Sequence, residues 1–381
     1  MDKTKSENTI SRKSFIKNCA LCSFGLWSTN LISAPLAVFA NTNAQLYRAK
    51  YWTYLSWEKI KCQLCPSECN IKPGEDGDCN ARGNRDAVLY SLVHSKPSVI
   101  MLDEIEKSPL YHYQLNEKVF SIATAGCNLV CKFCQNAEIS QVGPNAVETF
   151  DLTPTDVINR AKKHNVKSIN FFYTEPVIYY EYMLDIAKLA KNENMKTFCV
   201  TAGYINPDPL IELIPYIDAF VFGLKGFDDE FYKKYIGCSI EPIKKSLKIL
   251  AENSDKTWFE IVTLLIPGLN DGDEILNTMC NWINNEIGNH IPIHFTRFEP
   301  AYKMMDTPPT PINTLETAYK IAINNGLQYV YVGNIPGHEG NNTYCPKCKK
   351  LLIERINYSI INNYLNNGKC DCGNPIPGHW L

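Results

Sequence analysis

Residues 126–136 read Gly-Cys-Asn-Leu-Val-Cys-Lys-Phe-Cys-Gln-Asn. Cys127, Cys131 and Cys134 stand there at the spacing C-x3-C-x2-C, so three thiolates come from one tight loop. A structural zinc site takes four ligands, and a cubane iron–sulfur cluster has four irons that each need a ligand. Three cysteines therefore leave one iron of a cubane open to a small molecule. The alternative is a zinc knuckle that borrows a distant fourth ligand.

This loop directly follows an apolar run and opens a regular alternation of strand-like and helical patterns. Strands are expected at 119–124, 168–172, 197–200, 219–222, 259–264, 292–295 and 329–332, and helices at 154–164, 177–192, 209–214, 241–253, 273–287 and 314–325. Thr153 is the expected N-cap of the first helix. Such alternation indicates an α/β fold with a parallel sheet and helical crossovers. The number of units predicts a full or partial barrel, with its chemistry at the carboxyl ends of the strands.

A three-cysteine loop after the first strand of such a domain resembles the radical S-adenosylmethionine (SAM) superfamily. The resemblance implies a partial (β/α)6-type barrel and a [4Fe-4S] cluster on Cys127, Cys131 and Cys134, with SAM chelating the open iron. Reduction of the cluster cleaves the sulfonium and yields a 5′-deoxyadenosyl radical, which is chemistry of the cofactor itself. Phe133 matches the aromatic position that packs near the adenine.

The end of the second expected strand carries a candidate ligand for the methionyl amino group of SAM. Glu175 matches the acid of a Gly-Gly-Glu-like motif of the superfamily, although Tyr173 and Thr174 replace its glycines. A carboxylate suits an ammonium-type donor. The alternative is that Glu175 is simply an acidic residue at the start of the next helix.

Two later loops are also candidates for contacts to SAM. Gly203 follows the third strand, where the backbone could approach the cofactor or merely turn. Ile266 and Gly268 lie in a segment after the fifth strand that resembles the adenine-contacting segment of the superfamily. A plain Pro-Gly turn is the alternative for that segment.

Three polar residues at strand ends are candidate catalytic groups: Lys225, Arg297 and His338. The two cations could bind a substrate carboxylate or backbone, because barrel chemistry lies at this end of the strands. The alternative for each cation is a surface salt bridge, and the alternative for His338 is a structural role. Gly223 stands where the family usually has an aspartate, so a polar contact near the cofactor or substrate is absent here.

Several motifs together are similar to one subgroup, the AmmeMemoRadiSam-system radical SAM enzymes, which are related to pyruvate formate-lyase activating enzymes. The match runs from about Cys62 to Trp380. It includes Cys-Gln-Leu-Cys-Pro at 62–66, Gly-Asp-Cys at 77–79, Phe-Thr-Arg-Phe-Glu-Pro at 295–300, Pro-Pro-Thr-Pro at 308–311, Tyr-Val-Gly-Asn-Ile-Pro-Gly-His at 331–338 and Tyr-Cys-Pro-Lys-Cys at 344–348.

Eight further cysteines of the 16 form two outer sets. The first set is Cys62, Cys65, Cys69 and Cys79, which could hold zinc or a second iron–sulfur cluster, since both accept four thiolates. Two disulfides are the alternative if the protein is exported. The second set is Cys345, Cys348, Cys370 and Cys372, which resembles a zinc-ribbon knuckle. Its last pair is C-x-C where the family has C-x-x-C, which leaves its tetrahedral geometry open.

The chain of 381 residues divides into four predicted regions: a leader at 1–47, a Cys-rich N-terminal module at 48–118, the core barrel at 119–335 and a Cys-rich tail at 336–381. The leader resembles a twin-arginine export signal in which Lys13 replaces the second arginine, with small residues near Ala40 as a cleavage position. It predicts export to the periplasm. The alternative is an unused leader on a cytoplasmic protein. Polar residues and Pro35 within it argue against a stable membrane span.

Together these features predict a radical SAM enzyme that takes a hydrogen atom from a protein, with a glycyl-radical protein as one candidate, or from a small molecule. A low-potential electron donor of the flavodoxin or ferredoxin type is the implied partner. No nucleic-acid partner is expected at a net charge of −2. The alternative is a non-catalytic electron-transfer or metal-binding protein, in which SAM is not cleaved and the three-cysteine loop has a hidden fourth ligand.

Overall fold

The computed structural model describes residues 46–113 and 115–380. Within the chain, Leu46–Leu381 forms one compact unit. The predicted leader at 1–47 therefore lies outside the described residues, apart from its last two positions. No helix in the described ranges has both the length and the apolar character that crossing a bilayer requires.

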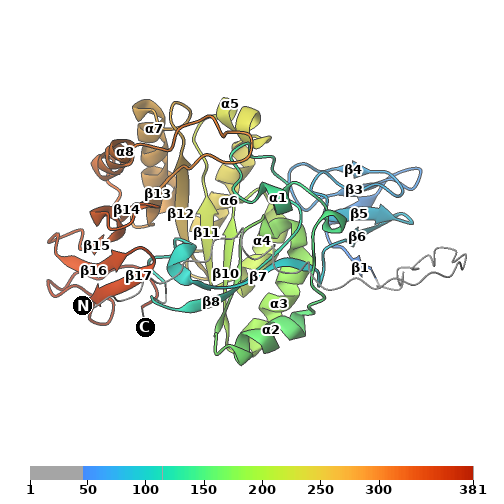
Figure 1. Cartoon of the computed structure of the whole chain (residues 1–381), viewed down its shortest axis with the longest axis horizontal. Coiled ribbons are helices and arrows are strands. Elements are labelled where there is room, and N and C mark those ends of the chain that lie inside the picture. Colours follow the sequence, from blue (N-terminus) through green and yellow to red (C-terminus); the bar gives the residue numbers. More distant parts are fainter. Residues whose placement is uncertain (1–45, 114, 381) are drawn as a thin grey trace, which may run out of the picture. The chain divides into compact units, whose positions relative to one another are not determined.

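A curved sheet of eight strands forms the core (Figure 1). Its strands, in spatial order, are β7 (Pro97–Glu104), β8 (Lys118–Thr124), β9 (Ser168–Phe171), β10 (Lys196–Thr201), β11 (Ala219–Gly223), β12 (Trp258–Leu265), β13 (Ile293–Arg297) and β14 (Val330–Gly333). Neighbours from β8 to β14 pair in parallel, and no pairing between described residues joins β14 to β7. The sheet is therefore an open barrel, and the predicted α/β fold with a partial barrel is confirmed.

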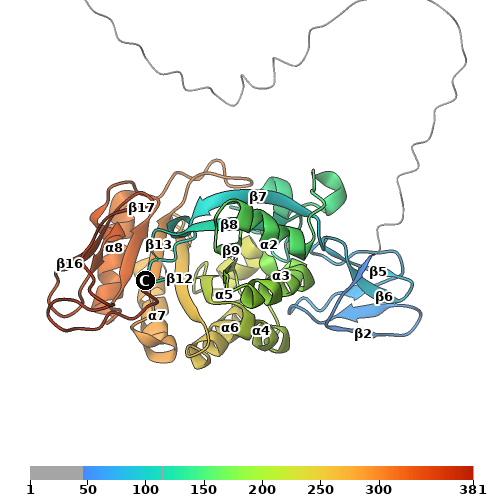
Figure 2. The same cartoon turned by 90° about the horizontal axis from the view of Figure 1, so that it is seen from below.

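Helices cross over between the parallel strands and lie along the outer side of the sheet (Figure 2). They are α2 (Pro154–Lys163), α3 (Tyr180–Asn192), α4 (Pro207–Leu213), α6 (Glu241–Glu252), α7 (Asp273–Ile283) and α8 (Ile312–Asn324). Thr153 caps α2 as predicted, and it forms a capping box with Asp156. Both faces of the central strands are covered, so β9 and β11 are buried along their whole length, and β11 is also apolar throughout.

Short elements complete the core at the ends of the strands and helices. They are the helices α1 (Ala137–Ser140) and α5 (Asp229–Phe231), the π-helical turns η5 (Tyr232–Ile236) and η6 (Asn284–Gly288), and the 3-10 turns η1 (Ile105–Lys107), η2 (Pro144–Ala146), η3 (Pro176–Tyr179), η4 (Ile214–Tyr216) and η7 (Glu339–Asn341). The six predicted helices all occur, in the predicted order, as α2, α3, α4, α6, α7 and α8. The short α1 and α5 and these turns were not predicted, because they carry no apolar periodicity that a sequence pattern could reveal.

The N-terminal module consists of two small antiparallel sheets. One contains β2 (Trp52–Tyr54), β3 (Ile60–Cys62) and β4 (Asn70–Ile71), and the other contains β1 (Tyr47–Arg48), β6 (Val88–Ser91) and β5 (Arg82–Arg85). The predicted boundary at residue 118 differs from the structure, because β7 already belongs to the core sheet. This strand runs antiparallel to β8 and covers its edge, which protects backbone groups that would otherwise stay unpaired.

The tail is a three-stranded antiparallel sheet of β15 (Thr343–Tyr344), β16 (Leu351–Ile356) and β17 (Ser359–Asn363). Its β16 and β17 pair antiparallel and form a hairpin. Buried Arg355 anchors it to the barrel, since its guanidinium donates to Thr343 Oγ1 at 2.8 Å and to the Tyr111 carbonyl at 3.0 Å. Figure 2 places this sheet beside β13 and α8, at the opposite side of the core from the N-terminal module.

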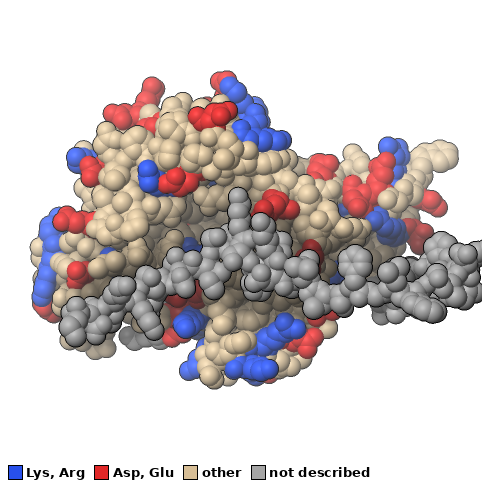
Figure 3. All heavy atoms as spheres, viewed as in Figure 1, with Lys and Arg blue, Asp and Glu red and all other residues tan. Residues whose placement is uncertain are grey.

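Acidic and basic side chains lie interspersed on the face drawn in Figure 3. This distribution agrees with the small net charge of the chain, −2. Most of these charges stand on the surface, where a single ion pair contributes little to stability.

Candidate active site at the strand ends

A pocket of about 410 Å3 lies at the carboxyl ends of the parallel strands. The loop after β8 supplies Cys127, Cys131 and Cys134 to its wall, so the structure brings the three predicted thiols to one cavity. Backbone bonds tie this loop to the π-helical turn η5, from the amide of Val130 to the carbonyl of Ile236 at 2.9 Å and from Lys132 to Tyr235 at 2.9 Å. No fourth cysteine of the described residues lines this pocket.

The thiols of this loop are in a desolvated environment. Burial raises the pKa of Cys131 to about 11 and lifts the pKa of Cys127 well above its usual value. Half-buried Lys225 also lines the pocket. Burial alone would lower its pKa, but the negative charge of the Cys131 and Cys134 thiolates outweighs that and raises it. Buried thiols beside a cation are a donor set that suits iron, because bound metal ions replace the thiol protons.

Glu175 lines the same pocket, at the N-cap of η3. Its carboxylate is buried and accepts bonds from Thr201 Oγ1 at 2.5 Å and from the Ala202 amide at 2.8 Å. Burial raises its pKa, and these donors only partly oppose the rise. Each carboxylate oxygen accepts more than one bond, so Glu175 retains capacity for an ammonium group from the pocket. Glu175 is thus both a residue at the start of a helical turn and a residue of the pocket wall.

Phe133 forms an apolar part of the pocket wall. Its ring is stacked with that of Phe231, with centroids 6.3 Å apart and planes inclined by 17°. The Lys225 Nζ lies 5.9 Å from the centre of the Phe133 ring. This position is compatible with the adenine contact that the resemblance implies.

Three predicted cofactor contacts lie away from this pocket. Gly203 has a φ of +71°, and the ring of Phe222 occupies the space of any side chain there. It lines a separate small apolar cavity behind the sheet. Ile266 is fully buried, and Gly268 forms an exposed turn. The side chains of Thr201, Ala202 and Leu264 line the pocket from these strands instead, because strand residues point inward while the loops beyond them turn outward.

Of the three candidate catalytic residues, only Lys225 lines the pocket. Arg297 instead donates from Nε to the Thr310 carbonyl at 2.9 Å and pairs with Glu299 at 3.0 Å. His338 accepts a bond from the Gly340 amide through Nδ1 and so caps η7. Arg297 thus forms the salt bridge that the alternative describes, and His338 bonds the backbone of η7, because both side chains turn from the strand ends toward local partners.

A polar trio beside the pocket, Tyr173, Asp103 and Lys107, was not predicted from the sequence. Tyr173 has a φ of +69°, a conformation that glycine adopts readily and that strains a tyrosine. Its hydroxyl donates to Asp103 at 2.7 Å and accepts from Lys107 at 3.0 Å. Tyr173 and Lys107 line the pocket. The replacement of the family's glycine by Tyr173 was the available signal, but its partners come from β7 and η1, which no motif marks.

Gly223, which replaces the aspartate expected from the resemblance, lines the pocket. An added Cβ there would lie 3.7 Å from the Lys225 Nζ, in ordinary contact. The site therefore has room for a side chain that this protein lacks. The pocket also has walls from outside the parallel strands, since Tyr358 of the tail hairpin and Tyr111 reach it.

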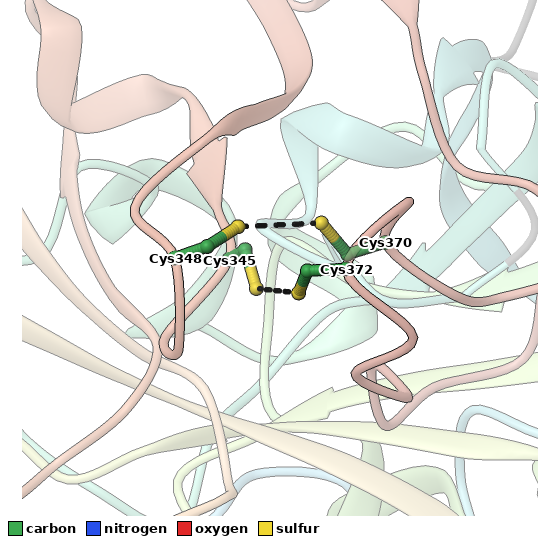
Figure 4. A group of neighbouring side chains, drawn as sticks. All are labelled: Cys345, Cys348, Cys370 and Cys372. Atoms are coloured by element: carbon green, nitrogen blue, oxygen red, sulfur yellow. Dashed lines mark hydrogen bonds between the residues drawn. The ribbon is translucent and has the colours of Figure 1, made fainter.

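The four tail cysteines form a compact cluster (Figure 4). The sulfurs of Cys345 and Cys372 are 3.7 Å apart, and those of Cys348 and Cys370 are 3.5 Å apart. All four lie within 4.8 Å of one another. The C-x-C spacing is therefore compatible with ligation of a single ion.

The N-terminal cysteines surround a second, enclosed pocket. Cys62, Cys65, Cys69 and Cys79 all line it. Burial raises the pKa of Cys69 and of Cys79 to about 12. All cysteines in the described residues are free thiols, so the disulfide alternative is not present in this structure.

Comparison with known proteins identifies the family. Residues 121–279 match the radical SAM superfamily. An uncharacterized protein of Methanocaldococcus jannaschii is 41% identical over 331 residues, which covers 86% of this chain and 98% of that protein. The pyruvate formate-lyase-activating enzyme of Clostridium pasteurianum is 27% identical over 166 residues, covering 42% of this chain and 67% of the enzyme. The pyruvate formate-lyase 1-activating enzyme of Escherichia coli K12 is 25% identical over 168 residues, covering 43% and 67%.

The match begins within β8 and ends within α7, so it includes the three-cysteine loop and most of the strands that form the pocket. This chain belongs to the radical SAM superfamily and is a radical SAM enzyme related to pyruvate formate-lyase activating enzymes.

Proposed function

We propose that Cys127, Cys131 and Cys134 are the three protein ligands of the [4Fe-4S] cluster, and that Glu175 and Phe133 bind SAM beside it. The observation that carries this proposal is that all five residues line one pocket at the strand ends. The donor set fits, because one loop supplies three thiols, of which that of Cys131 is buried and the other two are partly buried, and a cation stands next to them. When bound, the reduced cluster supplies the electron that cleaves SAM to a 5′-deoxyadenosyl radical.

The residues of the pocket bind and orient the cofactors and shield them. Lys225 offsets the negative charge of the thiolates and so favours their deprotonated form. Glu175 is held in one orientation by Thr201 and the Ala202 amide, which presents its remaining acceptor capacity to an ammonium group. Phe133 and Leu264 give the pocket an apolar part of its wall, against which a bound cofactor would be shielded from water, and such shielding protects a reactive species from side reactions.

The substrate proposed is a protein that presents one residue to this pocket. Support comes from the relatives, whose names describe enzymes that activate pyruvate formate-lyase. The AmmeMemoRadiSam motifs quoted above favour that subgroup within the superfamily. Electrons come in this proposal from a low-potential carrier of the flavodoxin or ferredoxin type. A small-molecule substrate is the other outcome that the experiments would reveal.

The test is anaerobic cleavage of SAM. The reconstituted protein is reduced with dithionite in the presence of SAM, and 5′-deoxyadenosine is quantified. Cys131→Ala is expected to abolish its formation, because the loop then has only two thiols. Cys280→Ala is the matched control, since Cys280 is equally buried but stands in α7, outside the pocket.

Formation of 5′-deoxyadenosine by the unmutated protein and the control, but not by Cys131→Ala, would support the assignment. Equal formation by all three proteins would refute it. No formation by any of them, despite a full complement of iron, would refute the proposed site as the place of SAM cleavage.

A further inference from the structure

The N-terminal cysteine set stands around a closed pocket that the core also helps to form. Residues of the core loop after β8 and of η3, including Asn128 and Val177, complete the wall that Cys62, Cys65 and their two partners begin. This position is unlike that of the tail set, which lies in a separate sheet. A group bound among the N-terminal thiols would touch the core directly.

The spacing of the sulfurs separates the two outer sets. Among the described residues, the tail holds the one group in which three or more potential ligand atoms all lie within 4.8 Å of one another, as the ligands of a single tetrahedral ion must. The N-terminal thiols do not form such a group, although all four line a common pocket. Ligands spread around a shared space suit a larger, polynuclear group.

A buried donor beside this pocket has no protein partner. Arg82 lines it and is 1% exposed. Its Nη atoms are engaged by Glu181 and by the Lys50 carbonyl, but its Nε has no hydrogen-bond partner. A buried polar group without a partner costs free energy. Thiolate and sulfide sulfurs of a bound cluster would accept from this N–H and relieve that cost.

The pocket adjoins the three-cysteine loop. Asn128 lies between Cys127 and Cys131 in the sequence and lines the N-terminal pocket together with Cys65, while its Nδ2 donates to the Tyr204 carbonyl at 2.8 Å. Gly126 has a φ of +98° and packs so closely on Cys79 that a methyl group there would collide with the Cys79 carbonyl oxygen. Asn128 and Gly126 of the three-cysteine loop therefore both lie against the N-terminal cysteines.

We propose that Cys62, Cys65, Cys69 and Cys79 hold a second, redox-active [4Fe-4S] cluster that passes electrons to the cluster on the central loop. A low-potential one-electron carrier would reduce the N-terminal cluster by one electron. That electron then moves to the central cluster, and the N-terminal cluster returns to its oxidised state. No bond is made or broken, and no proton moves. The transfer of this electron to the central cluster rests on the proposed function.

The first test counts metal in the anaerobically reconstituted full chain. The unmutated protein is expected to hold about eight irons, four for each cubane. A Cys127→Ala/Cys131→Ala/Cys134→Ala variant is expected to retain about four irons and to show the electron paramagnetic resonance signal of a reduced cubane after dithionite treatment. Because the tail set can hold one zinc ion of its own, the result that would overturn the proposal is a variant without iron that binds zinc beyond that single ion. The iron count does not depend on SAM cleavage, so failure of this proposal can be distinguished from failure of the proposed function.

The second test concerns electron transfer. Cys65→Ala/Cys69→Ala is expected to lose about four of the irons and to lose 5′-deoxyadenosine formation driven by reduced flavodoxin, while dithionite still drives it directly. Cys280→Ala is the control for cysteine loss. Unchanged flavodoxin-driven formation in a protein that lacks the N-terminal irons would overturn the relay. If this variant does not fold, as judged by circular dichroism, the iron content and spectrum of the triple variant decide.

Discussion

The ion pair between Arg82 and Glu181 is expected to be a major contributor to the stability of the N-terminal module on the core. Both side chains are nearly inaccessible, at 1% and 2% exposure. Arg82 Nη1 donates to both oxygens of Glu181, at 3.0 and 2.9 Å. Removal of one partner from a buried pair leaves an uncompensated charge, and such changes cost about 3–5 kcal/mol. We therefore expect Arg82→Met to lower the free energy of unfolding by about 3–5 kcal/mol.

The measurement is urea unfolding followed by circular dichroism under anaerobic conditions, with iron content determined in parallel. Lys162→Met is the matched control, because Lys162 pairs with Glu193 at the surface, where both side chains are nearly half exposed. The control should lose less than about 1 kcal/mol. Arg82→Met/Glu181→Met should recover much of the loss, since it removes both charges. A loss in Arg82→Met as small as in the control would refute the reasoning.

Two further predictions concern a histidine and a glycine. His112 is buried, with Nδ1 at 2.7 Å from the Pro377 carbonyl, and burial lowers its pKa from 6.5 to about 4. Between these pH values the unfolded chain takes up a proton that the folded chain does not, so the free energy of unfolding falls as the pH drops. Between pH 7 and pH 5 this group should lower the free energy of unfolding by about 2 kcal/mol. Unfolding curves of His112→Gln at the two pH values should lack this loss. Gly126→Ala should lower the free energy of unfolding by about 1–3 kcal/mol through backbone strain and should also lower the iron content. Gly143→Ala is the control and should change neither quantity, because Gly143 has a φ of −85° and an added Cβ would make ordinary contacts. An intact iron content in Gly126→Ala would contradict the close packing on Cys79.

Local patterns were sufficient for the core of this fold. Each parallel strand is a short apolar run, and each crossover helix has an apolar face, so both are visible within a few residues. The N-cap at Thr153 is likewise local. The edge strand β7 was missed because it exposes Met101 and Leu102 and gains its place only by pairing with β8.

One part of the candidate site could likewise be predicted from local sequence, and another part could not. The spacing of Cys127, Cys131 and Cys134 is a property of one loop, and the pocket contains all three. Arg297 and His338 also follow strands, but their side chains are drawn to Thr310, Glu299 and the Gly340 amide. A strand end places a residue near the pocket, whereas the direction of a long side chain depends on which partners surround it.

The amino-acid sequence by itself thus determined the three-cysteine motif and the succession of strands and helices along the chain, because cysteine spacing and apolar periodicity are local. The tertiary structure alone brought Tyr173 to Asp103 and Lys107 and joined Asn128 to the pocket of the N-terminal thiols. It also showed the tail thiols close together and the N-terminal thiols spread around a cavity. These relations join residues far apart in the chain, and only packing of the core determines which of them meet.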